Sequence, residues 1–207
     1  MRGRLLALAA FVTYNGWLAW GLTGDPHALA GYLSELAAQD QPYQWFFRLA
    51  DTLAAVVFTW IAILGRDGWR PWLGHRAPQV AGALVVAAAG TVLDAVFNLP
   101  CAQSRDAACI EAGFAVRVHE AASVLVSLAF LAGMVLTAVG LAQRIGWTRG
   151  PLIWAALTAV VAVLMLTSIL AEHVAPGTQG FVQAIYVLVC SAWVARLALR
   201  LPGGKDG

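Results

Sequence analysis

Six apolar stretches, each about twenty residues long, dominate this chain of 207 residues. A helix needs about 20 residues to cross a hydrocarbon core of about 30 Å. Backbone groups inside lipid must bond within their own segment, whereas barrel strands would be about half as long and alternating. We therefore predict an all-α polytopic membrane protein, a bundle of six transmembrane helices forming one domain over residues 1–207 with no soluble domain. The predicted spans lie at about residues 5–22, 45–64, 80–99, 118–142, 152–171 and 181–199.

The composition agrees with this class and argues against other partners. Hydrophobic residues make up 60% of the chain and charged residues 12%, which is about half the usual share in soluble domains. The net charge of +2 is small, and no basic patch is interleaved with aromatic residues. We therefore expect the lipid bilayer as the partner and no nucleic acid.

The charged residues sort to opposite ends of the predicted spans. Most basic residues flank one side, which by the positive-inside rule places both termini in the cytoplasm. The basic residues on that side are Arg2, Arg4, Arg66, Arg70, Arg76, Arg144, Arg149, Arg196, Arg200 and Lys205, with Asp67 and Asp206 as the acids. The other side carries Arg48, Arg105 and Arg117, with Asp25, Glu35, Asp40, Asp51, Asp94, Asp106, Glu111, Glu120 and Glu172.

The start of the chain also has features of a secretory signal. Arg2 and Arg4 precede an apolar run, but that run continues to Trp20 and no clear small-x-small cleavage site follows it. We therefore expect a retained first span.

Two of the three cysteines lie in one predicted outer loop. Cys101 and Cys109 fall between the third and fourth spans, where an oxidising compartment favours a disulfide. Two free thiols are the alternative. Their spacing is not that of a zinc-binding C-x-x-C pair.

The loop after the first span has a helical pattern. Asp25 and Pro26 resemble an N-cap followed by a first-turn proline, and Leu29, Leu33 and Leu36 recur at helical spacing. Polar Ser34, Glu35 and Gln39 lie opposite the leucines on this wheel. The pattern predicts a short amphipathic helix over the bundle mouth, or a plain connector helix.

Every predicted span also carries a polar group in its outer half. An ionised carboxylate facing lipid would cost several kcal/mol, so we expect these groups to share a partly wet interior. The candidate pocket residues are Asp94, Asp51, Glu120, His119, Asn98, Ser123, Asn15, Gln183 and Tyr186.

Asp94 differs from the other intramembrane acids. Asp51 lies three residues after Arg48, and Glu120 three residues after Arg117, so each acid has a basic neighbour on its own helix. Asp94, about five residues from the predicted end of its span, has no such neighbour. Its partner must come from another span, an ion, a proton or a ligand.

Several stretches resemble a bacterial family of small multi-pass proteins catalogued as domain of unknown function 998 and common in actinobacteria. The stretches lie at residues 24–36, 43–51, 93–101, 119–123 and 183–193. The resemblance covers nearly the whole chain and implies a six-helix protein of the bacterial plasma membrane with no established activity. This chain has Phe97-Asn98 where such relatives often carry Phe-Pro.

A more distant similarity is with membrane hydrolases of the alkaline ceramidase and adiponectin-receptor type. These hold zinc with intramembrane histidines and an aspartate near a serine, and the corresponding residue types here are Asp94, His119, His173 and Ser123. They have seven spans and two histidines one helical turn apart, which this chain lacks. The sequence requires no cofactor, and zinc is the alternative.

Three hypotheses follow for the function. The first is an outward-facing acidic pocket that binds a cation, a lipid headgroup or a partner without turnover. The second is a membrane-embedded, metal-dependent lipid hydrolase or transferase at the outer leaflet. The third is a proton- or cation-coupled transporter. The sequence shows no internal repeat and no central proline in any span, which argues against this hypothesis.

Overall fold

The computed structural model describes residues 1–106, 108–110 and 112–202, and within these residues it is helical without strands. The elements are α1 (Arg2–Tyr14), η1 (Gly16–Thr23), η2 (Leu33–Ala37), α2 (Gln44–Gly68), α3 (Arg70–Leu73), η3 (Gly74–Arg76), α4 (Ala77–Val96), α5 (Phe114–Ile145), α6 (Arg149–Val174) and α7 (Gln179–Leu199). In the described part of the chain, six helical segments are long and apolar enough to cross a membrane. The predicted six-helix bundle is confirmed.

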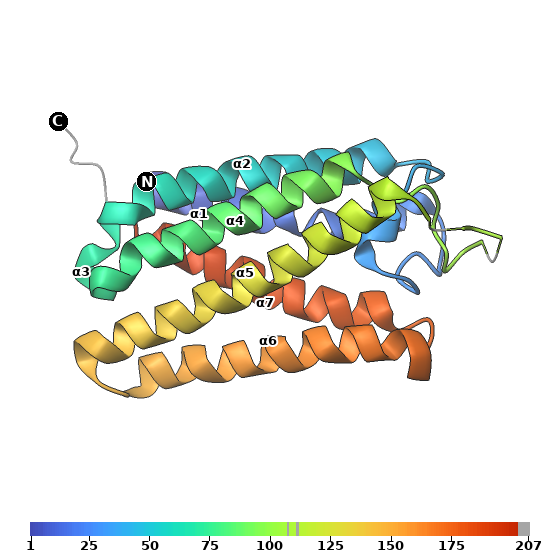
Figure 1. Ribbon diagram of the computed structural model, residues 1–207. Helices are drawn as coiled ribbons and strands as arrows, with labels where there is room; N and C mark the ends of the chain where they lie inside the picture. The colour runs from blue at the N-terminus through green and yellow to red at the C-terminus, as the bar shows by residue number, and fades with distance from the viewer. Residues whose placement is uncertain (107, 111, 203–207) are drawn as a thin grey trace.

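The long helices form a ring in the order of the chain. α1 packs on α2, α2 on α4, α4 on α5, α5 on α6 and α6 on α7, and α7 returns to α1. Figure 1 shows these helices side by side, each running back along its predecessor. Short connections between long helices favour this up-and-down arrangement.

The two ends of the bundle differ in structure. The cap end carries residues 24–43, 97–106, 108–110 and 112–113, which belong to the large loops at one end of Figure 1. The basic end carries the N-terminus, α3 and the turn between α5 and α6. The sequence assigned Lys205 and Asp206 to the basic end and Glu111 to the cap end, and these three residues lie outside the described part of the chain.

Aromatic side chains fill the middle of the ring. The Tyr14 ring packs on Phe58 and Phe130 at centroid distances of 5.1 and 5.4 Å. Phe130 also meets the buried Trp193 edge-on at 6.0 Å. This cluster closes the interior below the cap end, so a cavity at that end has an aromatic floor.

The first span is not one continuous α-helix as predicted. α1 ends at Tyr14, and η1 continues as an eight-residue 3₁₀-helix after Asn15. The Asn15 side-chain amide donates to the Phe11 carbonyl (2.7 Å) and to the Ser191 hydroxyl of α7 (2.8 Å). These bonds satisfy the carbonyl and anchor the break, so a span can change its winding without proline.

The short helix predicted after the first span is present only in part and begins later than Asp25. Residues 26–32 form turns, and only Leu33–Ala37 is helical, as the 3₁₀-helix η2. Asp25 begins a turn instead of a helix, with its carboxylate accepting from the His27 backbone N–H at 2.8 Å. A Cβ on Gly31 would clash with the side chains of Glu35 and Ser104, and a Cβ on Gly180 of α7 would clash with the Gly31 carbonyl. Tertiary packing has therefore overridden the local helical pattern.

The third span ends earlier than predicted. α4 stops at Val96, and Phe97 leaves the helical region with φ −97° and ψ 56°. Pro100 restricts Leu99 before it, which disfavours continued helix. Asp94 consequently lies two residues from the helix end, about 3 Å along the axis rather than the predicted 8 Å.

Candidate functional site

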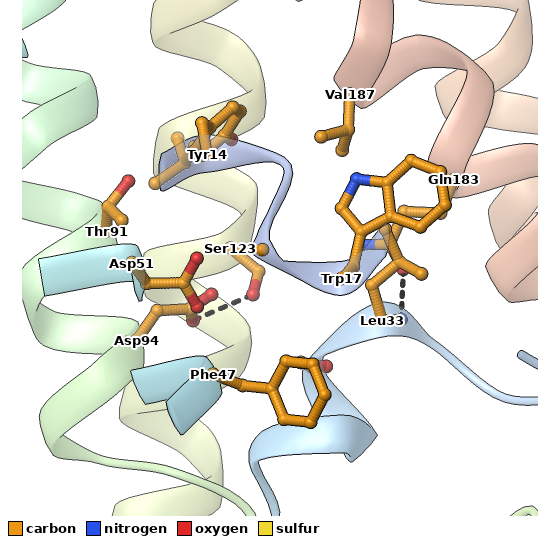
Figure 2. A pocket seen from close by; sticks show the side chains of 13 residues that line it. Tyr14, Trp17, Leu33, Phe47, Asp51, Thr91, Asp94, Ser123, Gln183 and Val187 are labelled. Carbon is orange, nitrogen blue, oxygen red and sulfur yellow. Dashed lines mark hydrogen bonds between the residues drawn. The ribbon is translucent and has the colours of Figure 1, made fainter. Parts of the chain in front are cut away.

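A cavity of about 100 Å³ opens between the helices at the cap end. Figure 2 shows its walls, which come from α1, α2, α4, α5, α7 and the 3₁₀-helices η1 and η2. The lining residues are Tyr14, Gly16, Trp17, Leu33, Ser34, Phe47, Asp51, Thr91, Asp94, Ser123, Val126, Gln183 and Val187. None of these described residues is basic.

Helical spacing explains why α2, α4, α5 and α7 each contribute two side chains to the cavity wall. Residues three or four apart lie on one helix face. Phe47 and Asp51 face the cavity from α2, Thr91 and Asp94 from α4, Ser123 and Val126 from α5, and Gln183 and Val187 from α7. Phe47 and Thr91 were not predicted, although their spacing from the two aspartates would have indicated them.

Asp94 finds its partners on α5. The Ser123 hydroxyl donates to Asp94 Oδ1 at 2.9 Å. His119 Nδ1 lies 3.2 Å from the same oxygen and 3.3 Å from the Asp94 carbonyl. His119 and Ser123 are one helical turn apart, so one face of α5 holds the carboxylate.

Gly90 allows these contacts by bringing α4 close to α5. A Cβ at this position would lie 2.6 Å from Val126 Cγ2 and 3.3 Å from the Ala122 carbonyl. Both separations are too short for an ordinary carbon contact, so a larger residue would push the helices apart. Gly90 is one turn from Asp94, and the close approach of the two helices brings the Ser123 hydroxyl within hydrogen-bonding distance of Asp94.

Asp51 has no such support. No hydrogen bond or ion pair joins its carboxylate to another residue in the described part of the chain. Figure 2 shows the Asp51 and Asp94 carboxyl groups pointing toward one another at the cavity wall. Two carboxyl groups thus meet in one small space with one of them lacking a protein partner.

The Arg48 neutralisation of Asp51 that the sequence allowed is absent. Arg48 Nε donates to the Ala95 carbonyl at 2.8 Å, and its guanidinium lies 4.5 Å from the Trp45 ring centroid. Ala95 belongs to the last turn of α4, whose carbonyls lack intrahelical donors and attract a cation. Arg48 therefore caps the C-terminal end of α4 and does not pair with Asp51, whose side chain lines the cavity.

Five predicted pocket residues do not line the cavity, although one of them, His119, contacts Asp94. Glu120 is exposed, because it lies about 100° around α5 from the His119 that contacts Asp94. Buried Asn98 lies beyond the end of α4 and donates to the Ala37 carbonyl at 2.8 Å. Asn15 anchors the break in the first span, and Tyr186 packs against the hydrophobic core.

The three candidate zinc ligands do not form a set. His119 contacts Asp94, but His173 is exposed near the end of α6 and does not line the cavity. A catalytic zinc needs three protein ligands. Within the described residues, no group of three or more histidine, cysteine or acidic side chains is placed to hold a metal ion. The described residues do not fit the zinc site that the sequence left open as an alternative.

The order of groups around Asp94 also differs from a hydrolytic triad. In a triad the histidine lies between the serine and the acid and takes the serine proton. Here Ser123 and His119 both approach the same Asp94 oxygen. The arrangement orients a carboxylate, and within the described residues no hydrogen bond joins the Ser123 hydroxyl to His119.

The roof of the cavity comes from the turn before η2 and from η2 itself. The Leu33 backbone N–H donates to Gln183 Oε1 on α7 at 2.6 Å, as drawn in Figure 2. The Tyr32 hydroxyl donates to Glu172 on α6 at 3.1 Å. Burial and the neighbouring Glu172 carboxylate raise the pKa of Tyr32 to about 12.

The buried Glu35 side chain links the roof segment to the loop that contains Ser104. The sequence did not indicate this role, because the predicted helix placed Glu35 on its polar face. Its side chain is 5% exposed. Its carboxylate accepts from the backbone N–H groups of Tyr32 (3.2 Å) and Ser104 (3.1 Å), and from the Ser104 hydroxyl. The distant Ser104 supplies two of these three hydrogen bonds, which offset the cost of burying the carboxylate.

The predicted disulfide is confirmed and lies beside this network. Cys101 and Cys109 are joined, with their Cα atoms 5.9 Å apart. The closed loop contains Ser104 and Arg105, and Arg105 bonds Asp25 (3.2 Å), the Ala28 carbonyl (3.1 Å) and Gln41. The disulfide loop is therefore attached to the segment that roofs the cavity.

The fold and its polar interior define a class, namely a multi-pass helical membrane protein with an acidic cavity at one end of the bundle. The chain belongs to the family described as "Protein of unknown function (DUF998)", which matches residues 7–200. No curated protein and no solved structure matched the chain. Membership supports the predicted family without adding an activity.

Proposed function

We propose that the protein binds a small organic cation, such as an alkylammonium group, in the cap-end cavity. The observation that carries the proposal is the pair of carboxyl groups of Asp51 and Asp94, which share a cavity without a basic side chain among its described lining residues. Like charges in a poorly solvated space destabilise one another. A bound cation relieves that repulsion and supplies the partner that Asp51 lacks.

The aromatic walls favour an organic ammonium over a metal ion. Rings of Tyr14, Trp17 and Phe47 surround the space beside the carboxyl groups. An ammonium is attracted to the faces of aromatic rings, most strongly where water is displaced. A divalent metal would need additional oxygen or nitrogen ligands, whereas these walls offer apolar contact. The volume of about 100 Å³ suits a ligand of a few heavy atoms.

We also propose that the cavity faces outward across a bacterial plasma membrane, with both termini in the cytoplasm. The clustering of arginine residues at the basic end supports this orientation through the positive-inside rule. The disulfide at the cap end supports it as well, because such bonds persist in oxidising compartments. The bacterial membrane rests on the family resemblance.

The binding test uses the purified protein in nanodiscs, titrated with ethylammonium, tetramethylammonium and calcium. Asp51→Asn and Asp94→Asn should each weaken ammonium binding about tenfold or more, the effect of losing one charge-assisted contact. Trp17→Leu should weaken tetramethylammonium binding more than ethylammonium binding. Glu120→Gln is the matched control, since Glu120 is an exposed acid outside the cavity.

Two results would contradict the proposal. One is ammonium affinity that is the same in wild type, Asp51→Asn and Asp94→Asn. The other is calcium binding that depends on these aspartates while neither ammonium ion binds, which would assign the site to a metal.

The broken first span favours a second candidate function, transport of the same cation. Discontinuous helices beside a binding site are common in transporters. Here the break at Asn15 adjoins Gly16 and Trp17, which line the cavity. Uptake of ethylammonium into proteoliposomes, lost in Asp51→Asn, would indicate transport. Binding without uptake at any pH would leave the protein as a receptor or accessory subunit.

A further inference from the structure

A second cavity lies on the outside of the bundle, between α4 and α5 at the cap end. It is an open groove of about 400 Å³. The groove is lined by Leu93, Phe114, Arg117, Val118, Ala121, Ala122 and Leu125. All of these residues except Arg117 are apolar, and all lie within the two membrane-spanning segments.

Side-chain size explains the shape of the groove. On α5 the lining combines the small Ala121 and Ala122 with the larger Val118 and Leu125. Leu93 from α4 and the exposed Phe114 complete the apolar lining. A concave apolar surface in hydrocarbon gains dispersion contacts when a chain lies in it. The groove therefore suits a single acyl chain.

Arg117 supplies a charge at the end of this groove. It is exposed in the first turn of α5, and no hydrogen bond or ion pair engages its side chain within the described residues, including with Glu120 three residues later. The other two basic residues at the cap end are engaged, since Arg48 bonds the Ala95 carbonyl and Arg105 bonds Asp25. A guanidinium matches a phosphate group in charge and shape.

We propose that this groove binds one anionic phospholipid, with an acyl chain along Ala121 and Ala122 and the phosphate on Arg117. The occupant is a membrane lipid because the groove opens toward the surroundings of the bundle on membrane-spanning helices. It is anionic because a single unpaired cation borders an otherwise apolar groove. The inference is independent of the cation cavity, which Asp94 and Ser123 line from inside the bundle.

A local probe is needed, because arginine residues at the basic end will also attract anionic lipids. Val124 is 56% exposed on α5 beside the groove. The native cysteines do not interfere with labelling, since Cys101 and Cys109 are paired and Cys190 is buried. Val124→Cys labelled with bimane, in phosphatidylcholine nanodiscs, reports quenching by acyl-brominated phosphatidylglycerol or phosphatidylcholine at equal mole fraction.

We expect the phosphatidylglycerol to quench at about fivefold lower mole fraction, the preference typical of one basic residue near an anionic headgroup. Arg117→Gln should remove the preference, because the two lipids then differ in no contact with the groove. Arg149→Gln should keep it, as an exposed arginine at the basic end matched in charge.

Three outcomes would overturn the inference. Equal quenching by both lipids in the wild type would show that the groove holds ordinary bilayer lipid. A preference that survives Arg117→Gln would place the anionic lipid elsewhere. Quenching by neither lipid would show that a protein segment, such as a second copy of the chain, covers the groove.

Discussion

The acidic residues of the cap end fall into two contrasting environments. Glu35 is almost fully buried, yet its carboxylate accepts hydrogen bonds from two backbone N–H groups and a hydroxyl. Asp94 has one hydroxyl and one histidine, and Asp51 has no partner within the described residues. The more buried carboxylate is thus the better satisfied, and the two at the cavity are left open.

The backbone explains the difference. Asp51 and Asp94 lie in α2 and α4, where the N–H groups near them already bond carbonyls four residues earlier. Such a carboxylate can be satisfied only by side chains, water or a ligand. Glu35 lies where turns leave N–H groups free, and the loop containing Ser104 supplies more. We therefore interpret Glu35, whose carboxylate accepts several hydrogen bonds from the protein, as a structural residue. Asp51 and Asp94, whose carboxylates accept fewer or none, remain able to bind a ligand.

The largest effect should come from breaking the satisfied network. Glu35→Ala leaves the Tyr32 and Ser104 N–H groups without an acceptor, and buried unpaired donors cost about 1–3 kcal/mol each. We expect a loss of about 3 kcal/mol in the free energy of unfolding, measured by thermal or denaturant unfolding in detergent. Glu120→Ala, at an exposed position, should change stability by less than about 0.5 kcal/mol. Equal losses in the two variants would refute a structural role for Glu35.

Removing the disulfide should have the next largest effect. Replacing Cys101 and Cys109 by serine releases a short loop, worth about 2.5 kcal/mol by chain entropy. Because Ser104 lies within that loop, part of the loss should overlap with that of Glu35→Ala. Unfolding of the combined variant tests this, since its loss of stability should be smaller than the sum of the two separate losses. Full additivity would separate the disulfide from the Glu35 network.

Substitution of Asp51, which lacks a protein partner, should raise stability instead of lowering it. Asp51→Asn removes a like charge near Asp94 and breaks no protein contact, so stability should rise, by up to about 1 kcal/mol. Unfolding under the same conditions as Glu35→Ala gives the comparison directly. A marked loss of stability would mean that Asp51 is a structural acid, against its assignment to the cavity.

The smallest effect concerns Tyr32 and alkaline pH. Its pKa is raised to about 12 from an ordinary value near 10, so the folded state holds the phenol proton more tightly than the unfolded state. The resulting stability is present below pH 10 and is lost as pH rises toward 12. Tyr32→Phe should flatten this part of the unfolding profile. An unchanged slope would indicate that another group titrates there.

Much of the fold followed from local sequence patterns. Apolar length predicted six spans, because a helix must satisfy its backbone within lipid whatever its neighbours are. The spacing of Cys101 and Cys109 within one loop predicted their pairing. The unpaired position of Asp94 on its own helix indicated a partner on another span, and Ser123 and His119 are the groups found there.

The failures have a common cause. Leucine spacing predicted a helix after the first span, but most of this segment forms turns that pack against Gly180 of α7 and Ser104. Spacing along α2 suggested that Arg48 would neutralise Asp51, but the end of α4 competes for it. In each case the deciding contact comes from residues far away in the chain.

The amino-acid sequence by itself determined a membrane-spanning helical chain and the clustering of acids toward one end, because both depend on local hydropathy and charge. Only the tertiary structure decided which acids meet and which are satisfied. Helix rotation places Asp51 and Asp94 at one cavity and turns Glu120 away from it. Loop docking supplies Glu35 with donors nearly seventy residues away, a pairing that no local pattern encodes.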